Sequence, residues 1–205
     1  YGQDWHVWEE NGRLIFQDEN GLLDLPLPKL IGAHQVQNAG IALATLRYLG
    51  KDSSSYDGAM LNADWPARMQ KLKNGPLITL APDAEIWLDG GHNKAAGHAL
   101  SEAISRLQSR KLFLIVGMLN TKDVMGYMQP LLNKSSDLYG VSIPGEAATM
   151  SAQETVDIAK DVGFKAIVSE NVESAIKDII KYDHNARILI CGSLYLAGNI
   201  LKENF

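Results

Sequence analysis

From residue 77 onward, short apolar runs alternate with segments of helical periodicity, and this alternation most constrains the fold. We interpret the apolar runs as strands and the segments between them as helices. In chain order they are Leu77–Leu80, Glu85–Leu88, helix 93–108, Lys111–Val116, helix 121–132, Asp137–Val141, helix 151–161, Ala166–Val168, helix 171–181, Arg187–Cys191 and helix 193–203. Such alternation forms βαβ units, which build parallel sheets through right-handed crossovers. We therefore predict an α/β domain with a mostly parallel sheet flanked by helices.

The first part of the chain follows a different pattern. Two strand-like runs, Trp5–Trp8 and Arg13–Gln17, flank the pair Asn11-Gly12, which is a strong hairpin turn signal. Further elements are expected in this order: a turn at 19–21, a strand at 22–25, and helices at 34–49 and 55–62. These elements predict a β-hairpin followed by a helical segment.

Residues 1–63 are too few and too irregular for a convincing independent domain. We expect them to be the C-terminal tail of another domain whose bulk is absent from this chain. The segment 64–75 is then a linker, and residues 76–205 form the α/β domain. The start of the chain carries no Met and no signal pattern, which suggests a piece of a longer protein.

Composition limits the partners of this chain. The net charge of −5 gives no electrostatic reason to expect nucleic acid or an anionic membrane as a partner. No run approaches the roughly 18 apolar residues that a membrane span needs. The single cysteine, Cys191, lies in an apolar run and is expected to be a buried core residue. Because one cysteine cannot form a disulfide within the chain, we expect a reducing, cytoplasmic location.

The string Leu88-Asp89-Gly90-Gly91-His92-Asn93 lies where a strand should pass into a helix. In open α/β sheets, ligands bind outside the carboxyl ends of the strands. Asp89 can accept hydrogen bonds from ribose hydroxyls, and the helix N-terminus near His92 favours an anion. Alternatively, Asn93 caps the helix and Asp89 makes a turn. Ser193, after the last strand, is either a helix cap or a contact to a ligand.

Two motifs upstream suggest contacts to a nucleotide. His34, Gln35 and Asn38 share the first turn of a helix, and a planar amide carries the donor and acceptor that suit an adenine edge. Alternatively, these residues only cap the helix. Trp65-Pro66 forms a stiff joint that directs Arg68, whose guanidinium can bind phosphate bidentately. The alternative for this arginine is a surface ion pair.

Several common ligand-binding motifs are missing from the sequence. There is no Gly-x-Gly-x-x-Gly, and Gly50-Lys51 is followed by Asp52, where a P-loop needs Ser or Thr. No Cys/His spacing fits zinc. We therefore expect neither a P-loop nor a metal site within this chain.

Taken in order, the motifs resemble the C-terminal half of the folylpolyglutamate synthase family, often bifunctional dihydrofolate synthases in bacteria. This family belongs to the wider class of ATP-dependent Mur-type amide ligases. The resemblance runs from about Pro26 to Leu201 and depends on the ordered patterns Gly-x-His-Gln-x-x-Asn-Ala, Trp-Pro-x-Arg, Leu-Asp-Gly-x-His-Asn, Gly-x-Leu-x-x-Lys-Asp and Cys-Gly-Ser-Leu-Tyr-Leu-Ala-Gly. Some positions depart from the family: Ala67 replaces a usual glycine, Gly91 a usual alanine and Lys94 a usual proline.

The resemblance implies a Rossmann-like Mur ligase C-terminal domain, preceded by the tail of the central ATP-binding domain. It also implies a ligase that uses ATP and Mg²⁺ to add L-glutamate to dihydropteroate or a folate through an acyl phosphate. The family's P-loop, magnesium ligands and most of its folate site lie in the N-terminal part, so this chain alone is expected to be inactive. Asn38 would then contact adenine, Arg68 the phosphates and Asp89 the ribose. His92 would border the reaction zone as the catalytic residue, and Ser193 is a possible substrate contact.

Two other functions remain open at this level. A cell-wall amino-acid ligase of the same superfamily would share the nucleotide residues, although the Gly-Ser-Leu-Tyr segment at 192–195 favours the folate branch. A stand-alone nucleotide-binding or regulatory α/β module is the second alternative. Receiver domains also place an aspartate at a strand end, but they need an acidic pair after the first strand, and only Asp83 is found there.

Overall fold

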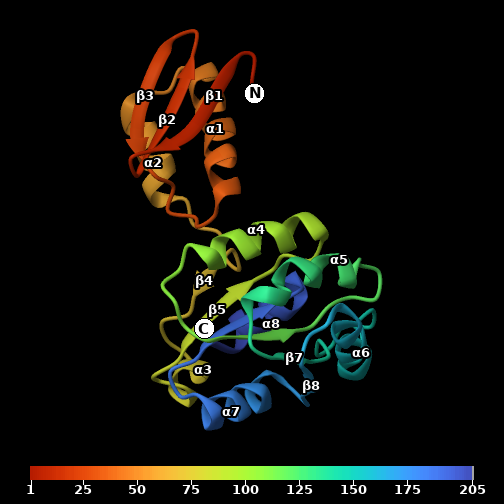
Figure 1. The fold of residues 1–205 in the computed structure, drawn as a ribbon. Helices are drawn as coiled ribbons and strands as arrows, with labels where there is room; N and C mark the ends of the chain where they lie inside the picture. The colour runs from red at the N-terminus through yellow and green to blue at the C-terminus, as the bar shows by residue number, and fades with distance from the viewer. Residues whose placement is uncertain (205) are drawn as a thin grey trace. The chain divides into compact units, whose positions relative to one another are not determined.

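A computed structural model describes residues 1–204 of the chain, which divide into two compact units. The first unit is Tyr1–Pro66, and the second begins at Ala67 and contains the rest of the described chain (Figure 1). Within the described residues, no helix has both the length and the apolar character that crossing a membrane would require. Each unit has its own hydrophobic core and is described separately below.

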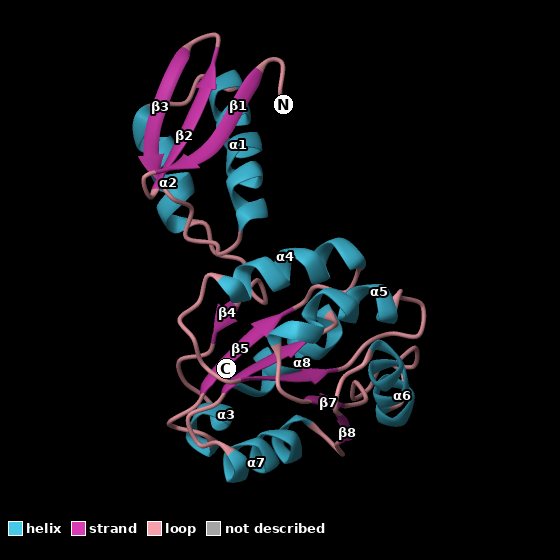
Figure 2. Cartoon of the chain, in the orientation of Figure 1, coloured by secondary structure: helices cyan, strands magenta, loops and turns pink. Residues whose placement is uncertain are grey.

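The first unit is a three-stranded antiparallel sheet packed against two helices (Figure 2). Its elements are β1 (Trp5–Glu10), β2 (Arg13–Asp18), β3 (Gly21–Pro26), α1 (Ala33–Tyr48) and α2 (Ser53–Asn62). The predicted hairpin is confirmed: Asn11 and Gly12 both have positive φ and join β1 to β2. Leu14, Phe16 and Leu43 are fully buried between the sheet and the helices.

The second unit contains a six-stranded sheet with the strand order β4-β5-β9-β6-β7-β8. Its strands are β4 (Gln70–Lys71), β5 (Glu85–Asp89), β6 (Leu112–Val116), β7 (Leu138–Gly140), β8 (Ala166–Val168) and β9 (Arg187–Cys191). Only the short edge strand β4 is antiparallel to its neighbour. The predicted mostly parallel α/β sheet is therefore confirmed.

Helices cover both faces of this sheet. They are α3 (Pro76–Leu80), α4 (Lys94–Ser105), α5 (Val124–Met128), the 3₁₀ helix η1 (Gln129–Lys134), α6 (Ala152–Val162), α7 (Val172–Tyr182) and α8 (Leu194–Asn204). Alternate side chains of β5, β6 and β9 pack against α3, α7 and α8 in one core. Figure 2 shows α4 and α5 on the opposite face. Because both faces are covered, the interiors of the central strands are continuous apolar runs rather than alternating ones, as in Ile86–Leu88, Leu112–Val116 and Ile188–Cys191.

Three sequence-based assignments differ from the structure. The run Leu77–Leu80, interpreted as a strand, belongs to helix α3, because Gly75 at φ 99° turns the chain and Pro76 occupies the first helical turn. The predicted helix at 121–132 is split into α5 and η1. The predicted linker 64–75 contains the two-residue strand β4, so Gln70 and Lys71 belong to the sheet through their pairing with β5.

A partly buried ion-pair cluster joins the amino ends of β5 and β9. The Arg187 guanidinium donates from Nε to Glu85 Oε2 at 2.8 Å and from Nη1 to the Gln108 carbonyl at 2.8 Å. Lys71 donates to Glu85 Oε1 at 2.8 Å. Burial alone would raise the pKa of Glu85, but the hydrogen bonds and charges of Lys71 and Arg187 outweigh it and lower the pKa from 4.5 to about 2.

We expect Glu85→Gln to lower the free energy of unfolding at neutral pH by about 1–2 kcal/mol, since water reaches part of this cluster and screens it. A carboxylate whose pKa is depressed on folding stabilises above its unfolded pKa, here 4.5, and loses that contribution as the pH falls towards about 2. Wild type should therefore lose its advantage over the variant across this range in urea unfolding. Glu173→Gln is the control, because Glu173 and Lys177 form an exposed pair at 3.9 Å. An equal pH response in wild type and Glu85→Gln would contradict the prediction.

Candidate functional site

The carboxyl ends of three parallel strands lie side by side in the second unit. Asp89 ends β5 and is in register with Cys191 at the end of β9, which is in register with Val116 at the end of β6. The neighbouring strands β5 and β9 continue into helices on opposite faces of the sheet, α4 after β5 and α8 after β9, so a topological switch point lies between β5 and β9 at this edge. In open α/β sheets, this is where ligands bind.

Asp89 is buried, with 8% of its surface exposed, and its carboxylate organises the backbone around it. Its Oδ1 accepts the Gly91 N–H at 2.8 Å, and its Oδ2 accepts the Met69 N–H at 2.9 Å. The turn-making role that the sequence offered as an alternative is therefore present. The contact to ribose stays a prediction.

His92 and Asn93 follow at the start of α4. His92 Nδ1 lies 2.9 Å from the Gly90 carbonyl oxygen. Because a carbonyl only accepts, Nδ1 carries the proton, and Nε2 remains as the second polar atom of the ring. Asn93 Oδ1 accepts the Ala96 N–H at 2.9 Å, so Asn93 is the helix cap. The backbone thus sets the orientation of the His92 ring, and its catalytic role stays a prediction.

Ser193 follows β9 and is 3% exposed. Its Oγ accepts the Tyr195 N–H at 3.0 Å, which satisfies a backbone donor in the first turn of α8. The preceding Gly192 has φ 105°, and a Cβ there would lie 2.7 Å from Met118 Cγ. Only glycine fits this tight passage from strand to helix. The capping role is therefore present, and a substrate contact by Ser193 stays a prediction.

Tyr127 and Cys191 are fully buried beneath this edge. Burial raises the pKa of the Cys191 thiol to about 12, so the thiol is uncharged at neutral pH and is no nucleophile. The expectation of a buried core cysteine is confirmed. Burial, followed by the nearby Cys191 and Asp89, raises the pKa of Tyr127 well above its ordinary value. No local pattern in the sequence pointed to Tyr127, which lies in the apolar segment of α5.

The structure brings the backbone of Arg68 next to Asp89 and the turn that follows β5. The side chain of Arg68 is exposed, whereas its neighbours Ala67 and Met69 are buried. The Met69 N–H bond to Asp89 and a 2.8 Å bond from the Gly90 N–H to the Ala67 carbonyl hold this segment against the end of β5. Arg68, Asp89 and His92 therefore belong to one local structure.

Asn38 lies in the first unit, on the first half of α1. It donates from Nδ2 to Gln35 Oε1 at 3.0 Å, and Gln35 Nε2 donates to His34 Nε2 at 3.0 Å. Since an amide nitrogen only donates, His34 Nε2 is the acceptor in this network. Gln35 is buried, and Asn38 is exposed. The network therefore orients the Asn38 amide, and its contact to adenine stays a prediction.

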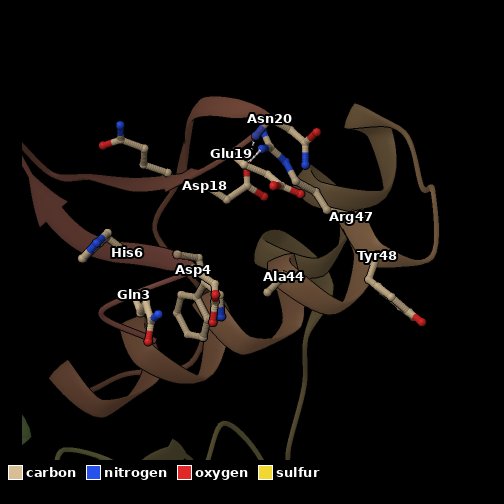
Figure 3. Close-up of a pocket in the computed structure, with 11 residues that line it drawn as sticks. Gln3, Asp4, His6, Asp18, Glu19, Asn20, Ala44, Arg47 and Tyr48 are labelled. Atoms are coloured by element: carbon tan, nitrogen blue, oxygen red, sulfur yellow. Dashed lines mark hydrogen bonds and ion pairs between the residues drawn. The ribbon is translucent and has the colours of Figure 1, made fainter.

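A separate pocket of about 790 Å³ opens within the first unit (Figure 3). It lies between the start of β1, the β2–β3 turn and the end of α1, and is lined by Gln3, Asp4, Trp5, His6, Gln17, Asp18, Glu19, Asn20, Ala44, Arg47 and Tyr48. Arg47 forms an ion pair with Asp18 and donates to the Gly21 carbonyl at 3.1 Å. Tyr48 points away from the hollow in Figure 3. None of the site residues predicted from the sequence lines this pocket.

The described residues contain no group of three or more His, Cys, Asp or Glu side chains placed to hold a metal ion. We assign no chemical step to a metal held by this chain.

Residues 78–203 match the family described as "Dihydrofolate synthetase, C-terminal domain". The chain belongs to this family. Its match includes Asp89, His92 and Ser193. Over 206 residues the chain is 26% identical to the folylpolyglutamate synthase of Lacticaseibacillus casei, covering 95% of this chain and 44% of that protein.

Solved structures share the fold of this chain. The E. coli protein FolC, in complex with DHPP and ADP, has a TM-score of 0.80 at 23% identity, covering 98% of this chain and 46% of FolC. A bifunctional folylpolyglutamate synthase/dihydrofolate synthase from Yersinia pestis, complexed with AMPPNP and Mn, has a TM-score of 0.77 at 21% identity, covering 98% of this chain and 45% of that protein. The chain thus spans about half the length of the relatives it matches.

Proposed function

We propose that this chain is the C-terminal part of an ATP-dependent ligase that adds L-glutamate to dihydropteroate, to a folate, or to both. The observation that carries the proposal is the family match over residues 78–203, which includes Asp89, His92 and Ser193 at the carboxyl ends of β5 and β9. The relative from L. casei is named a folylpolyglutamate synthase, and the E. coli structure contains ADP. The name of the first relative and the ADP bound in the second both agree with nucleotide-dependent ligation of glutamate.

In this proposal, the chain supplies contacts to the nucleotide. The Asn38 amide reads the adenine edge, the Arg68 guanidinium binds the phosphates, and the Asp89 carboxylate accepts hydrogen bonds from the ribose. The exposed guanidinium of Arg68 supports its role, and the position of Asp89 at the carboxyl end of β5, beside the Arg68 segment, supports a contact to the same nucleotide. His92 lies in the same cluster, with its Nε2 available to donate to a phosphate oxygen when the ring is protonated.

The proposed reaction has two steps. A carboxylate oxygen of the pterin substrate attacks the γ-phosphorus of ATP, the bond to the leaving oxygen breaks, and ADP and an acyl phosphate form. The glutamate amine then attacks the acyl carbon, the C–N bond forms, inorganic phosphate leaves, and the nitrogen loses a proton. These steps need positioning and charge neutralisation more than a protein nucleophile, which suits a site of fixed polar groups. Magnesium would be held by residues outside this chain.

We expect this chain alone to release no ADP above background from ATP, magnesium, dihydropteroate and L-glutamate, because its sequence has no P-loop. The full-length polypeptide that carries the chain should release ADP and phosphate only when ATP, glutamate and the pterin are all present. Mass spectrometry should find the pterin product with glutamate added. Omission of each substrate in turn is the control. Turnover with a cell-wall precursor and its amino acid, but not with a pterin, would favour the other branch of the superfamily and overturn the proposal.

A further inference from the structure

The loop that carries Arg68 has an unusual backbone. Ala67 has φ 56° and Met69 has φ 43°, so two residues with side chains adopt the left-handed conformation that favours glycine. Both of these side chains are buried, and Arg68 between them is exposed. Such backbone persists only where the surrounding structure over-determines it. The loop therefore needs identifiable contacts that hold it.

Three hydrogen bonds hold the loop. The Ala67 N–H donates to Gln70 Oε1 at 2.9 Å, and the Met69 N–H donates to Asp89 Oδ2 at 2.9 Å. The Gly90 N–H donates to the Ala67 carbonyl at 2.8 Å. Gln70 itself lies in β4 and pairs with Leu88 of β5. One side chain from β4 and one from β5 therefore close the two ends of the loop, with Arg68 at its tip.

We propose that Gln70 is a positioning residue that acts with Asp89 to aim Arg68 at the phosphates of the nucleotide. This inference rests on the proposed function, because it requires that Arg68 binds phosphate. A guanidinium binds phosphate bidentately only in a narrow range of directions, and its long side chain is mobile unless its base is fixed. Gln70 contributes an acceptor at Oε1, and a glutamate at this position would keep that acceptor. Alanine would leave the Ala67 N–H without it.

The first test measures the loop itself and does not depend on the function. Trypsin cleaves after arginine, and the Arg68–Met69 bond is cut only when the loop opens. In this chain, Gln70→Ala should speed that cleavage about tenfold, the change expected in the open population when one hydrogen bond is lost. Gln70→Glu should stay near the wild-type rate. Cleavage after Lys134, an exposed residue outside the loop, is the internal reference. Unchanged cleavage at Arg68 in Gln70→Ala would show that Gln70 does not hold the loop and would overturn the proposal.

The second test measures kcat/KM for ATP in the full-length polypeptide. Gln70→Ala should lower it at least about tenfold, since small misplacements of a binding group reduce turnover strongly. Gln70→Glu should restore it, and Gln70→Ala should have no further effect in an Arg68→Ala background. An equal loss in both backgrounds would show that Gln70 does not act through Arg68. If the wild-type polypeptide ligates nothing, the proposed function and the contact of Arg68 to the phosphates are both overturned. The trypsin comparison still tests whether Gln70 holds the loop.

Discussion

Replacing Arg68 by alanine in the full-length polypeptide is expected to lower kcat/KM for ATP by about 100- to 1,000-fold, the loss typical of removing a preorganised donor to developing charge. Arg68→Lys should still cost about tenfold, because lysine keeps the charge but loses the planar fork. The melting temperature should be unchanged in both variants, since the Arg68 side chain is exposed. Steady-state kinetics with ATP as the varied substrate, together with thermal melting, check this prediction.

Arg13→Lys is the matched control for these variants. Arg13 is also an exposed arginine, and it pairs with Asp24 on the surface of the first unit at 2.7 Å. A surface ion pair of this kind tolerates lysine with an effect of about 1 kcal/mol or less on stability. Its turnover should equal that of wild type. Normal turnover in both Arg68→Lys and Arg68→Ala would contradict a contact between Arg68 and the phosphates, and would show that Arg68 is a surface arginine like Arg13.

The fold was largely predictable because local signals and tertiary burial agree over most of the chain. Parallel strands covered on both faces are mostly apolar, so β6, and β9 after Arg187, appear in the sequence as continuous apolar runs. The hairpin followed from Asn11-Gly12, whose positive φ values match the turn. The exception is α3, a short apolar run whose periodicity does not separate strand from helix. In this segment, Gly75 turns the chain and Pro76 starts a helix, so the run is helical and not a strand.

The candidate site was predictable where its residues follow a strand directly. The placement of Asp89 and Ser193 at this edge could be predicted because polar residues at the end of an apolar strand lie at the ligand-binding edge of an α/β sheet, while their contacts to a ligand stay predictions. Gln70 and Tyr127 were missed because their contacts come from tertiary structure. Gln70 lies in a two-residue strand without an apolar pattern, and Tyr127 reaches the site from helix α5. The left-handed Ala67, where the resemblance predicted a glycine, was the one local hint of the loop.

Asp89→Ala is expected to lower the free energy of unfolding of the second unit by about 3–5 kcal/mol. The carboxylate accepts two backbone N–H groups, and each hydrogen bond to a charged group contributes about 1.5–3 kcal/mol. Its removal leaves the Met69 and Gly91 N–H groups without that acceptor. Asp89→Asn should cost about 2 kcal/mol, because one amide oxygen replaces two acceptors and the NH₂ group faces a donor. Urea unfolding of this chain, followed by circular dichroism, measures both values.

Asp123→Ala is the control for the aspartate variants. Asp123 accepts a single backbone N–H, from Gly126 at 2.9 Å, at the exposed start of α5, so its loss should cost about 1 kcal/mol. In the full-length polypeptide, Asp89→Asn should also weaken the use of ATP more than the use of the pterin, because Asp89 holds the Arg68 loop as well as its own proposed ribose contact. A stable Asp89→Asn variant with unchanged ATP kinetics would contradict both roles. Destabilisation with unchanged ATP kinetics would leave Asp89 with the loop alone and show that the loop does not aim Arg68.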